Sequence, residues 1–447
     1  MVEAVRKTRL RVFLQENHPG DGHFIVGENK QPFFYLGDTA WELFHRLSYQ
    51  EAEHYLRDRA GKKFNVIQAV VISEFNGLTV PNKYGELPLH NNDPRKPNNR
   101  YFDYVDLIID LANSLGLYVG VLPTWGDKVN KKWGGGPEIF TPENAREYGE
   151  FLGRRLRDKM IIWILGGDRP CESEAHYAVW RSMAEGLRMG DDGSHLITYH
   201  PMGGMSSSRF FHNEPWLDFN MLQSGHSARN IPNYEMIRND YDMKPTKPCL
   251  DGEARYEDHP INWNPENGWF DDHDARQAAY WGVFAGAFGH TYGCHDIWQF
   301  FEIGREPISY ARTPWKAALN LPGASQMQHL RSLIESFPML NRIPDQSMIA
   351  NDVGKGAEHI QATRGADCSY ALVYIPTGRE VALSLNRFFK NRLVAYWYNP
   401  RTGVAETMGE LDNAPRKTFT PPSSGPKEDW VLVLIDKDAE RETRFPS

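Results

Sequence analysis

Two acidic residues each follow an apolar run, and together they could cleave a glycosidic bond. Asp168 follows MIIWILGG at residues 160–167, and Glu253 lies within KPCLDGEARYE at residues 247–257. Glycoside hydrolysis needs one protonated carboxylic acid for the leaving oxygen and a second, ionised carboxylate. We therefore predict that Asp168 is the general acid/base and that Glu253 is the nucleophile.

The neighbouring residues favour this assignment of roles. Two glycines and an apolar strand give Asp168 a dry setting, which raises the pKa of a carboxyl group. If the strand continued beyond Glu253, Arg255 would point to the same side of it. This cation and the phenol of Tyr256 would then keep Glu253 ionised.

Two other acids compete with Glu253 for the role of nucleophile. Asp251 lies two residues earlier, on the same face of an extended strand, and Glu257 follows four residues later. Acids at strand ends also have structural roles, bonded to loop amides or to nearby arginines.

An alternation of strands and helices would bring the two acids together. Helical periodicity and capping signals predict helices that begin near residue 48 and at about 101–115, 142–157, 173–188, 233–242, 272–288 and 323–335. Apolar runs between them predict eight strands, at residues 32–37, 64–72, 117–123, 160–166, 195–200, 218–222, 249–252 and 290–297. This α/β pattern is typical of a (β/α)8 TIM barrel, in which the C-terminal strand ends face one pocket.

The pattern changes near residue 340. Short alternating strands at 359–363, 370–374, 381–385, 393–398 and 430–435 are separated by turns such as PTG and NPRTG. This spacing predicts a small β-sandwich. We expect residues 1–340 to form the barrel domain, with an N-terminal β-hairpin around the turn at 19–22, and residues 341–447 to form the second domain.

Polar and aromatic residues at the other strand ends are candidates for binding the sugar. Tryptophans could stack on sugar faces, although packing at the barrel rim would explain them equally well. A histidine there could hold the nucleophile or a hydroxyl group, and an acid after the first strand could bind two hydroxyls or cap a helix. The candidates are Asp38, Trp41, Glu74, Trp125, His200, Gln223, His226, Tyr256 and Trp298.

Composition excludes several other functions. The net charge is −8 and there is no long basic block, so nucleic acid is not an expected partner. No run of about 18 apolar residues could span a membrane. The motifs HExxH and GxSxG and a phosphate-binding loop are absent, as is HxH after the first strand. We expect no metal and no cofactor, and we interpret the acidic cluster at 271–274 as a helix cap.

The cysteines and the N-terminus give information about the cellular location of the protein. Cys171, Cys249, Cys294 and Cys368 have no paired spacing, so buried reduced thiols are expected. The first ten residues contain no apolar core, so we expect no signal peptide. A cytoplasmic location is therefore favoured, or secretion if a leader has been removed. The number of subunits cannot be inferred.

Several motifs together resemble the apiosidase-like glycoside hydrolases of family 140. They are GDTAWELF at 37–44, FNVIQAV at 64–70, GGD at 166–168 and DGE at 251–253. The tail, with YWYNPRTG at 396–403 and DWVL at 429–432, resembles a small C-terminal domain labelled as collagen-binding, a label we treat as nominal. The resemblance covers nearly the whole chain.

The resemblance implies a TIM barrel with its acid/base on strand four and its nucleophile on strand seven, which map onto Asp168 and Glu253. It implies retention of anomeric configuration, exo action and a pectic substrate that contains apiose. The wider clan has Asn-Glu where this chain has Gly167-Asp168, and a shorter acid needs a closer backbone, which the glycines permit. If the backbone did not come closer, the distance between the two carboxyl groups would increase and an inverting mechanism would become possible. Alternatives are a cellulase-like, arabinosidase or xylosidase specificity, or a carbohydrate-binding protein without turnover.

Overall fold

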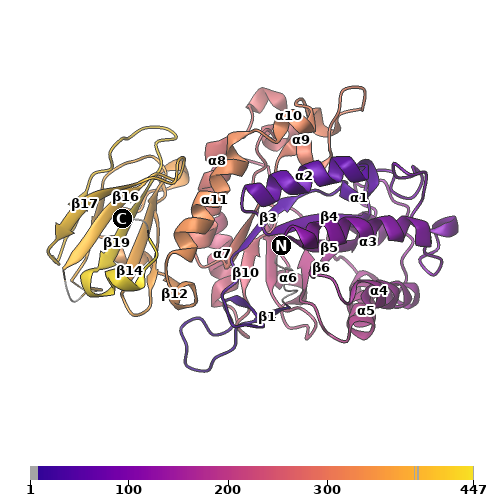
Figure 1. Ribbon diagram of the computed structural model, residues 1–447, viewed down its shortest axis with the longest axis horizontal. Helices are drawn as coiled ribbons and strands as arrows, with labels where there is room; N and C mark the ends of the chain where they lie inside the picture. The colour runs from indigo at the N-terminus through magenta and orange to yellow at the C-terminus, as the bar shows by residue number, and fades with distance from the viewer. Residues whose placement is uncertain (1–8, 387, 390–391, 446–447) are drawn as a thin grey trace, which may run out of the picture.

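A closed parallel sheet surrounded by helices forms the larger part of the protein. The computed structural model describes residues 9–386, 388–389 and 392–445 (Figure 1). The expectation that the chain carries no signal peptide depends largely on residues 1–8, which lie outside the described residues. Within the described part, no helix is long and apolar enough to cross a membrane.

Eight parallel strands make the barrel, which confirms the predicted fold class. In spatial order the sheet runs β7-β6-β5-β4-β3-β11-β10-β9, with the short β8 antiparallel to β9. The amide of Asp218 donates to the carbonyl of Ile197 over 2.9 Å, and this contact brings β7 beside β9 to close the barrel. The strands are β3 (Tyr35–Thr39), β4 (Val66–Ile72), β5 (Tyr118–Thr124), β6 (Ile161–Gly166), β7 (Ile197–His200), β8 (Met205–Ser206), β9 (Asn220–Gln223), β10 (Cys249–Asp251) and β11 (Gly289–Tyr292).

Helices connect successive strands and begin at the caps that the sequence predicts. Ser48 caps α2 in a capping box with Glu51, and Thr141 caps α4 with Pro142 at its first turn. The helices are α1 (Leu43–Arg46), α2 (Tyr49–Gly61), α3 (Asn99–Ser114), α4 (Pro142–Leu156), α5 (Glu174–Asp191), α6 (Ser208–Phe211), α7 (Asn233–Asp242), α8 (Asp272–Phe284), α9 (His295–Trp298), α10 (Trp315–Ala318) and α11 (Pro322–Glu335).

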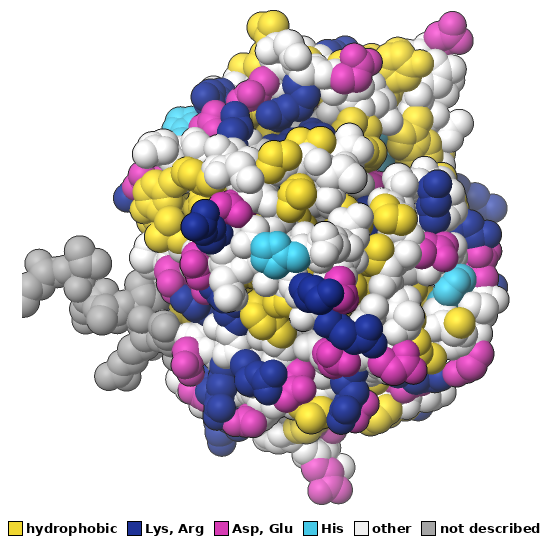
Figure 2. All heavy atoms as spheres, turned by 90° about the vertical axis from the view of Figure 1, so that its right-hand side faces the viewer, with side chains coloured by type: hydrophobic (Ala, Val, Ile, Leu, Met, Phe, Trp, Pro, Cys, Tyr) yellow, Lys and Arg dark blue, Asp and Glu magenta, His cyan; other side chains and the backbone are white. Residues whose placement is uncertain are grey.

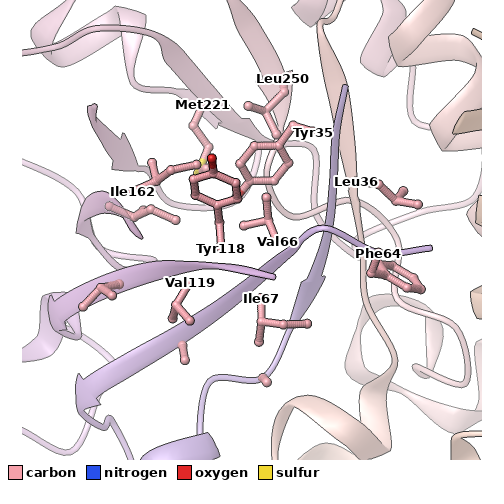
Figure 3. Packing of buried hydrophobic residues seen from close by; sticks show 14 of the residues in the cluster. Tyr35, Leu36, Phe64, Val66, Ile67, Tyr118, Val119, Ile162, Met221 and Leu250 are labelled. Carbon is pink, nitrogen blue, oxygen red and sulfur yellow. The ribbon is translucent and has the colours of Figure 1, made fainter. Parts of the chain in front are cut away.

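Apolar side chains fill the interior of the barrel beneath the site. Strand side chains alternate between the two faces of a sheet, so every second residue points inward. Figure 3 shows the inward side chains gathered together, among them Tyr35, Val66, Tyr118, Ile162, Met221 and Leu250. Burying each large apolar side chain contributes about 1.5–3 kcal/mol. This packing gives the strand ends a rigid base.

The C-terminal part consists of two antiparallel sheets around their own core, as the predicted sandwich requires. The six-stranded sheet has the order β12-β13-β14-β19-β16-β17, and β15 pairs with β18. Leu383, Trp397 and Leu432 belong to the buried cluster of this part. The strands are β12 (Arg342–Pro344), β13 (Gln361–Gly365), β14 (Tyr370–Ile375), β15 (Val381–Leu383), β16 (Leu393–Tyr398), β17 (Ala405–Leu411), β18 (Lys417–Phe419) and β19 (Trp430–Asp436); the hairpin before the barrel pairs β1 (Leu10–Val12) with β2 (Ile25–Gly27).

The two parts meet at α8 and α11, which lie between the barrel and the C-terminal sheets (Figure 1). Arg276 of α8 donates two hydrogen bonds of 3.0 Å to the carboxylate of Asp429, and both side chains are buried. The hydroxyl of Tyr374 donates to the same carboxylate over 3.1 Å, and its ring stacks on Tyr280. A charged pair in such a setting fixes how the sheets dock on the barrel.

Two local predictions need correction. The eighth strand ends at Tyr292 rather than at residue 297, because His295–Trp298 form the helix α9. Cys368 is only half-buried, whereas Cys171, Cys249 and Cys294 are buried as expected; all four are free thiols. On the face of the molecule opposite the C-terminal sheets, acidic and basic side chains are interspersed (Figure 2).

Candidate active site

A cavity of about 570 Å³ opens where the C-terminal ends of the barrel strands converge. Asp168 and Glu253 both line it, so the fold brings together two acids that are far apart in the sequence. Seven of the expected sugar contacts also line it: Trp41, Glu74, Trp125, Gln223, His226, Tyr256 and Trp298.

Glu253 follows the end of β10 and is held on both carboxylate oxygens. His226 Nε2 lies 3.0 Å from Oε1, and His200 Nε2 lies 3.0 Å from Oε2. The backbone before it is fixed as well, because the side-chain amide of Gln68 donates to the carbonyl of Gly252 over 3.1 Å. The carboxylate is therefore buried but has a set orientation.

These contacts determine the charge of Glu253. Burial opposes ionisation, but the contacts with His200 and His226 lower the pKa of Glu253 to about 2. The expected partner Arg255 does not contribute: its Nε donates to the carbonyl of Asp274 over 3.2 Å and its guanidinium lies over Trp281. The strand ends at Asp251, so the alternation that would have placed Arg255 beside Glu253 does not continue.

Asp168 stands on a bend of left-handed backbone after β6. The φ angles of Gly166, Gly167 and Asp168 are +85°, +121° and +52°. A Cβ on Gly167 would lie 2.7 Å from the nitrogen of Gly126 and 2.8 Å from the ring of Trp125, so only glycine fits there. The bend presses the chain against β5 and turns Asp168 into the cavity.

The surroundings of Asp168 favour its protonated form. Burial and the negative charge of Glu253 raise the pKa of Asp168, against the opposing effects of Arg169 and His200. The indole of Trp133 donates to Oδ2 over 3.2 Å, and Arg169 donates to the same oxygen over 2.9 Å. Since both donors use Oδ2, Oδ1 remains to carry a proton.

The two rival acids lie outside the cavity lining. Asp251 is buried and accepts hydrogen bonds from Ser224 and Asn233. Glu257 accepts from the hydroxyl of Tyr292 over 2.5 Å. Each carboxyl group is therefore occupied by structural partners.

Two of the expected sugar contacts are not at the cavity surface. Asp38 is fully buried, with Oδ2 bonded to Arg59 and, over 2.7 Å, to the hydroxyl of Tyr55. A buried arginine requires a counter-ion, so Asp38 has this structural role and the expectation of sugar binding is corrected. His200 is also fully buried and acts behind Glu253, with its ring edge-on to Trp41.

Several lining residues were not predicted from the sequence. Trp133 comes from the loop after β5, and His259, Trp263 and Ile308 come from loops after β10 and β11. Loop residues without strand periodicity give little signal. Arg169 directly follows Asp168, and this adjacency was the one available indication of its contact with the acid.

The acidic cluster after residue 270 caps α8, as expected. Asp271 accepts from the amides of His273 and Asp274 in a capping box, and Lys427 pairs with its other oxygen. Oxygen and nitrogen atoms of Asp271, His273 and Asp274 lie within 4.8 Å of one another, a spacing that could also suit a cation. Arg229 pairs with Asp274, so the carboxylates already have cationic partners.

A carboxyl pair with opposite pKa shifts at the mouth of a TIM barrel has the features of a glycoside hydrolase, and comparison with known proteins supports this. The model of the family described as "Apiosidase-like, catalytic domain" matches residues 20–341. The chain belongs to the apiosidase-like family. Residues 343–435 match the family described as "Putative collagen-binding domain of a collagenase".

Solved structures similar to this apiosidase-like chain are also glycoside hydrolases. One described as "Glycoside hydrolase" is 34% identical with a TM-score of 0.88, and the match covers 97% of this chain and 98% of that one. A glycoside hydrolase family 5 protein from Bacteroides vulgatus is also 34% identical with a TM-score of 0.88, over 98% and 94% of the two chains. No curated protein sequence matches. The chain is therefore a glycosidase of the O-glycosyl type.

Proposed function

We propose that this protein is a retaining, exo-acting glycosidase of apiosidase-like specificity that removes a sugar from a pectic glycan. The observation that carries the proposal is the pair of carboxyl groups in one cavity with pKa shifts of opposite sign: raised for Asp168 and lowered for Glu253. Such a pair separates the acid from the nucleophile at one pH.

In the proposed mechanism Asp168 gives its proton to the glycosidic oxygen while Glu253 attacks the anomeric carbon. The bond to the leaving group breaks and a glycosyl ester forms on Glu253. Asp168, now ionised, then takes a proton from water, which attacks the same carbon and frees Glu253. Tyr256 and Trp41 line the same cavity as Glu253, with the indole of Trp41 donating to the phenol oxygen of Tyr256 over 3.1 Å.

The shape and lining of the cavity support a small glycoside as substrate. A volume of about 570 Å³ falls in the usual range for small-molecule pockets. Trp41, Trp125 and Trp298 line the cavity, and an aromatic ring is the kind of surface on which a sugar can stack. The match to the apiosidase-like family supports apiose as the sugar released.

A panel of aryl glycosides that includes β-apioside tests the proposal. We expect the apioside to be hydrolysed fastest, and NMR of the first product to show the anomeric configuration of the substrate. Asp168→Asn and Glu253→Gln should each lower kcat/KM by at least about 10³-fold with an unchanged circular dichroism spectrum. Near-normal turnover by either variant would exclude these roles.

Other results of the same panel would redirect the proposal. Faster release of arabinose, xylose or glucose would assign another specificity to the same barrel. Product of inverted configuration would make Glu253 a general base that activates water. Glycan binding without turnover on any substrate would favour a carbohydrate-binding protein.

A further inference from the structure

Arg169 connects Asp168 to a second acid, Glu74. One terminal nitrogen of the guanidinium donates to Asp168 Oδ2 over 2.9 Å and to the backbone carbonyl of Asp168 over 2.7 Å. The other terminal nitrogen donates to Glu74 Oε1. Arg169 is 2% exposed and lies 95 positions from Glu74, so two acids from distant parts of the chain share one buried cation.

This contact raises a difficulty for an acid that must hold a proton. A guanidinium within hydrogen-bond distance favours the ionised form of a carboxyl group. Without a second carboxylate, Arg169 would lower the pKa of Asp168, and Asp168 would lose the proton that bond cleavage needs. A second carboxylate on the same guanidinium offsets this effect.

The packing keeps Arg169 in this position. A Cβ on Gly134 would lie 2.5 Å from its terminal nitrogen, and a Cβ on Gly126 would lie 3.0 Å from its side chain. The ring of Trp133 covers the guanidinium, with 4.8 Å between the ring centroid and the central carbon. The arginine is thus enclosed and has little freedom to leave either acid.

On these contacts, and given the proposed function, we propose that Glu74 is a positioning residue that acts through Arg169 to keep the proton on Asp168. Glu74 neutralises the guanidinium and holds it on Oδ2, which leaves Oδ1 to donate. This role differs from the sugar contact expected for Glu74 from its place at a strand end.

The other charged groups around the two acids are consistent with this role. Asp127 lies near Glu74 but is paired with Lys128 over 2.7 Å, and Lys128 also reaches the backbone carbonyl of Glu74. Glu253 lines the same cavity and raises the pKa of Asp168, whereas His200, buried behind Glu253, opposes this rise.

The titration of Glu74 acts in the same direction. Burial raises the pKa of Glu74 to about 7, with Arg169 opposing the shift and Asp127 and Asp168 adding to it. Glu74 gains its negative charge as the pH rises through this value. From that point it resists loss of the proton on Asp168.

The variant Glu74→Gln tests the proposal because it removes the charge and keeps the shape. The basic limb of the kcat/KM profile reports the acid of the free enzyme. We expect this limb to move to lower pH by about 1 unit. The loss of rate should be largest for aryl glycosides with basic leaving groups and small for dinitrophenyl glycosides, which need little proton donation.

Two further variants make the result unambiguous. Glu74→Asp keeps the charge and should restore the basic limb at least in part. Glu172→Gln is the matched control, because Glu172 is exposed and pairs with Lys132 over 2.6 Å outside the site; its profile should match the wild type.

The outcomes separate the two proposals. A raised KM for Glu74→Gln with an unmoved basic limb and equal losses for all leaving groups would make Glu74 a sugar contact and overturn the inference. A wild-type enzyme that hydrolyses no glycoside would instead overturn the proposed function. Circular dichroism and thermal unfolding of each variant show whether it is folded.

Discussion

His226 contacts Glu253 through Nε2 at 3.0 Å and accepts the backbone amide of Tyr256 on Nδ1 at 3.4 Å. Because Nδ1 accepts the amide, Nε2 is the ring nitrogen that donates to the carboxylate. The chain segment that carries Glu253 thus orients the ring that donates to its carboxylate.

This arrangement predicts how His226→Ala changes the pH profile. Loss of one donor should raise the pKa of Glu253 from about 2. A nucleophile with a lowered pKa loses activity as the pH falls through that pKa, so the acidic limb of kcat/KM should move upward by about 1 pH unit. His90→Ala, at an exposed position outside the cavity lining, is the control; an unchanged acidic limb in His226→Ala would contradict the prediction.

The bend before Asp168 predicts that Gly167→Ala is costly for activity. The new Cβ would meet Gly126 and Trp125 at under 3 Å, on a backbone with φ of +121°. We expect kcat/KM to fall at least about 10-fold through displacement of the acid and the free energy of unfolding to fall by about 1–3 kcal/mol.

A second glycine distinguishes the effect of backbone strain from the effect of moving Asp168. Gly193 also has a positive φ, of +64°, but a Cβ there would meet nothing within 4 Å. Gly193→Ala should lower stability alone and leave kcat/KM unchanged. Equal activity in the two alanine variants would show that the position of Asp168 does not depend on the fit of Gly167.

Trp133 is predicted to act on both the acid and the leaving group. Trp133 is 58% exposed and lines the cavity, while its indole nitrogen donates to Asp168. Trp133→Phe keeps an aromatic face and loses the donor, so kcat should fall roughly 3-fold at similar KM. Trp133→Ala should also raise KM for substrates with aromatic or sugar leaving groups. A KM change of equal size in both variants would exclude the stacking role.

The buried pair of Arg276 and Asp429 predicts that the C-terminal sheets stabilise the barrel. Asp429→Ala leaves the arginine without its main partner and should lower the free energy of unfolding by about 3 kcal/mol. Urea denaturation measures this cost. Asp412→Ala removes an exposed partner of Arg392 and should have little effect; a similarly small effect in Asp429→Ala would show that the pair does not hold the two parts together.

Much of the barrel was predictable because its signals are local. Val/Ile runs, capping boxes such as Ser48 with Glu51, and helical stop signals fall between one strand and the next. The antiparallel strands β17 and β18 were not predicted. β17 lies at the edge of its sheet with mostly exposed side chains, so its apolar pattern is weak.

The two candidate acids could be selected from the sequence, but the residues that contact them could not. Asp168 and Glu253 stand out because each ends an apolar run. The pairing of Glu253 with His200 and His226 depends on strands that meet only in the closed barrel. Asp38 also lies near the end of a strand, but it pairs with Arg59 of α2 and is buried. Its position in the sequence therefore gave no indication of this structural role.

Among the residues that the structure describes, those that line the cavity all precede residue 310, whereas the C-terminal sheets contact α8 and α11 from outside. The residues that can select a substrate and the contacts that brace the barrel from outside therefore lie in separate parts of the chain. Substitutions in the C-terminal sheets would then change the lifetime of the folded enzyme without changing which linkage it cleaves.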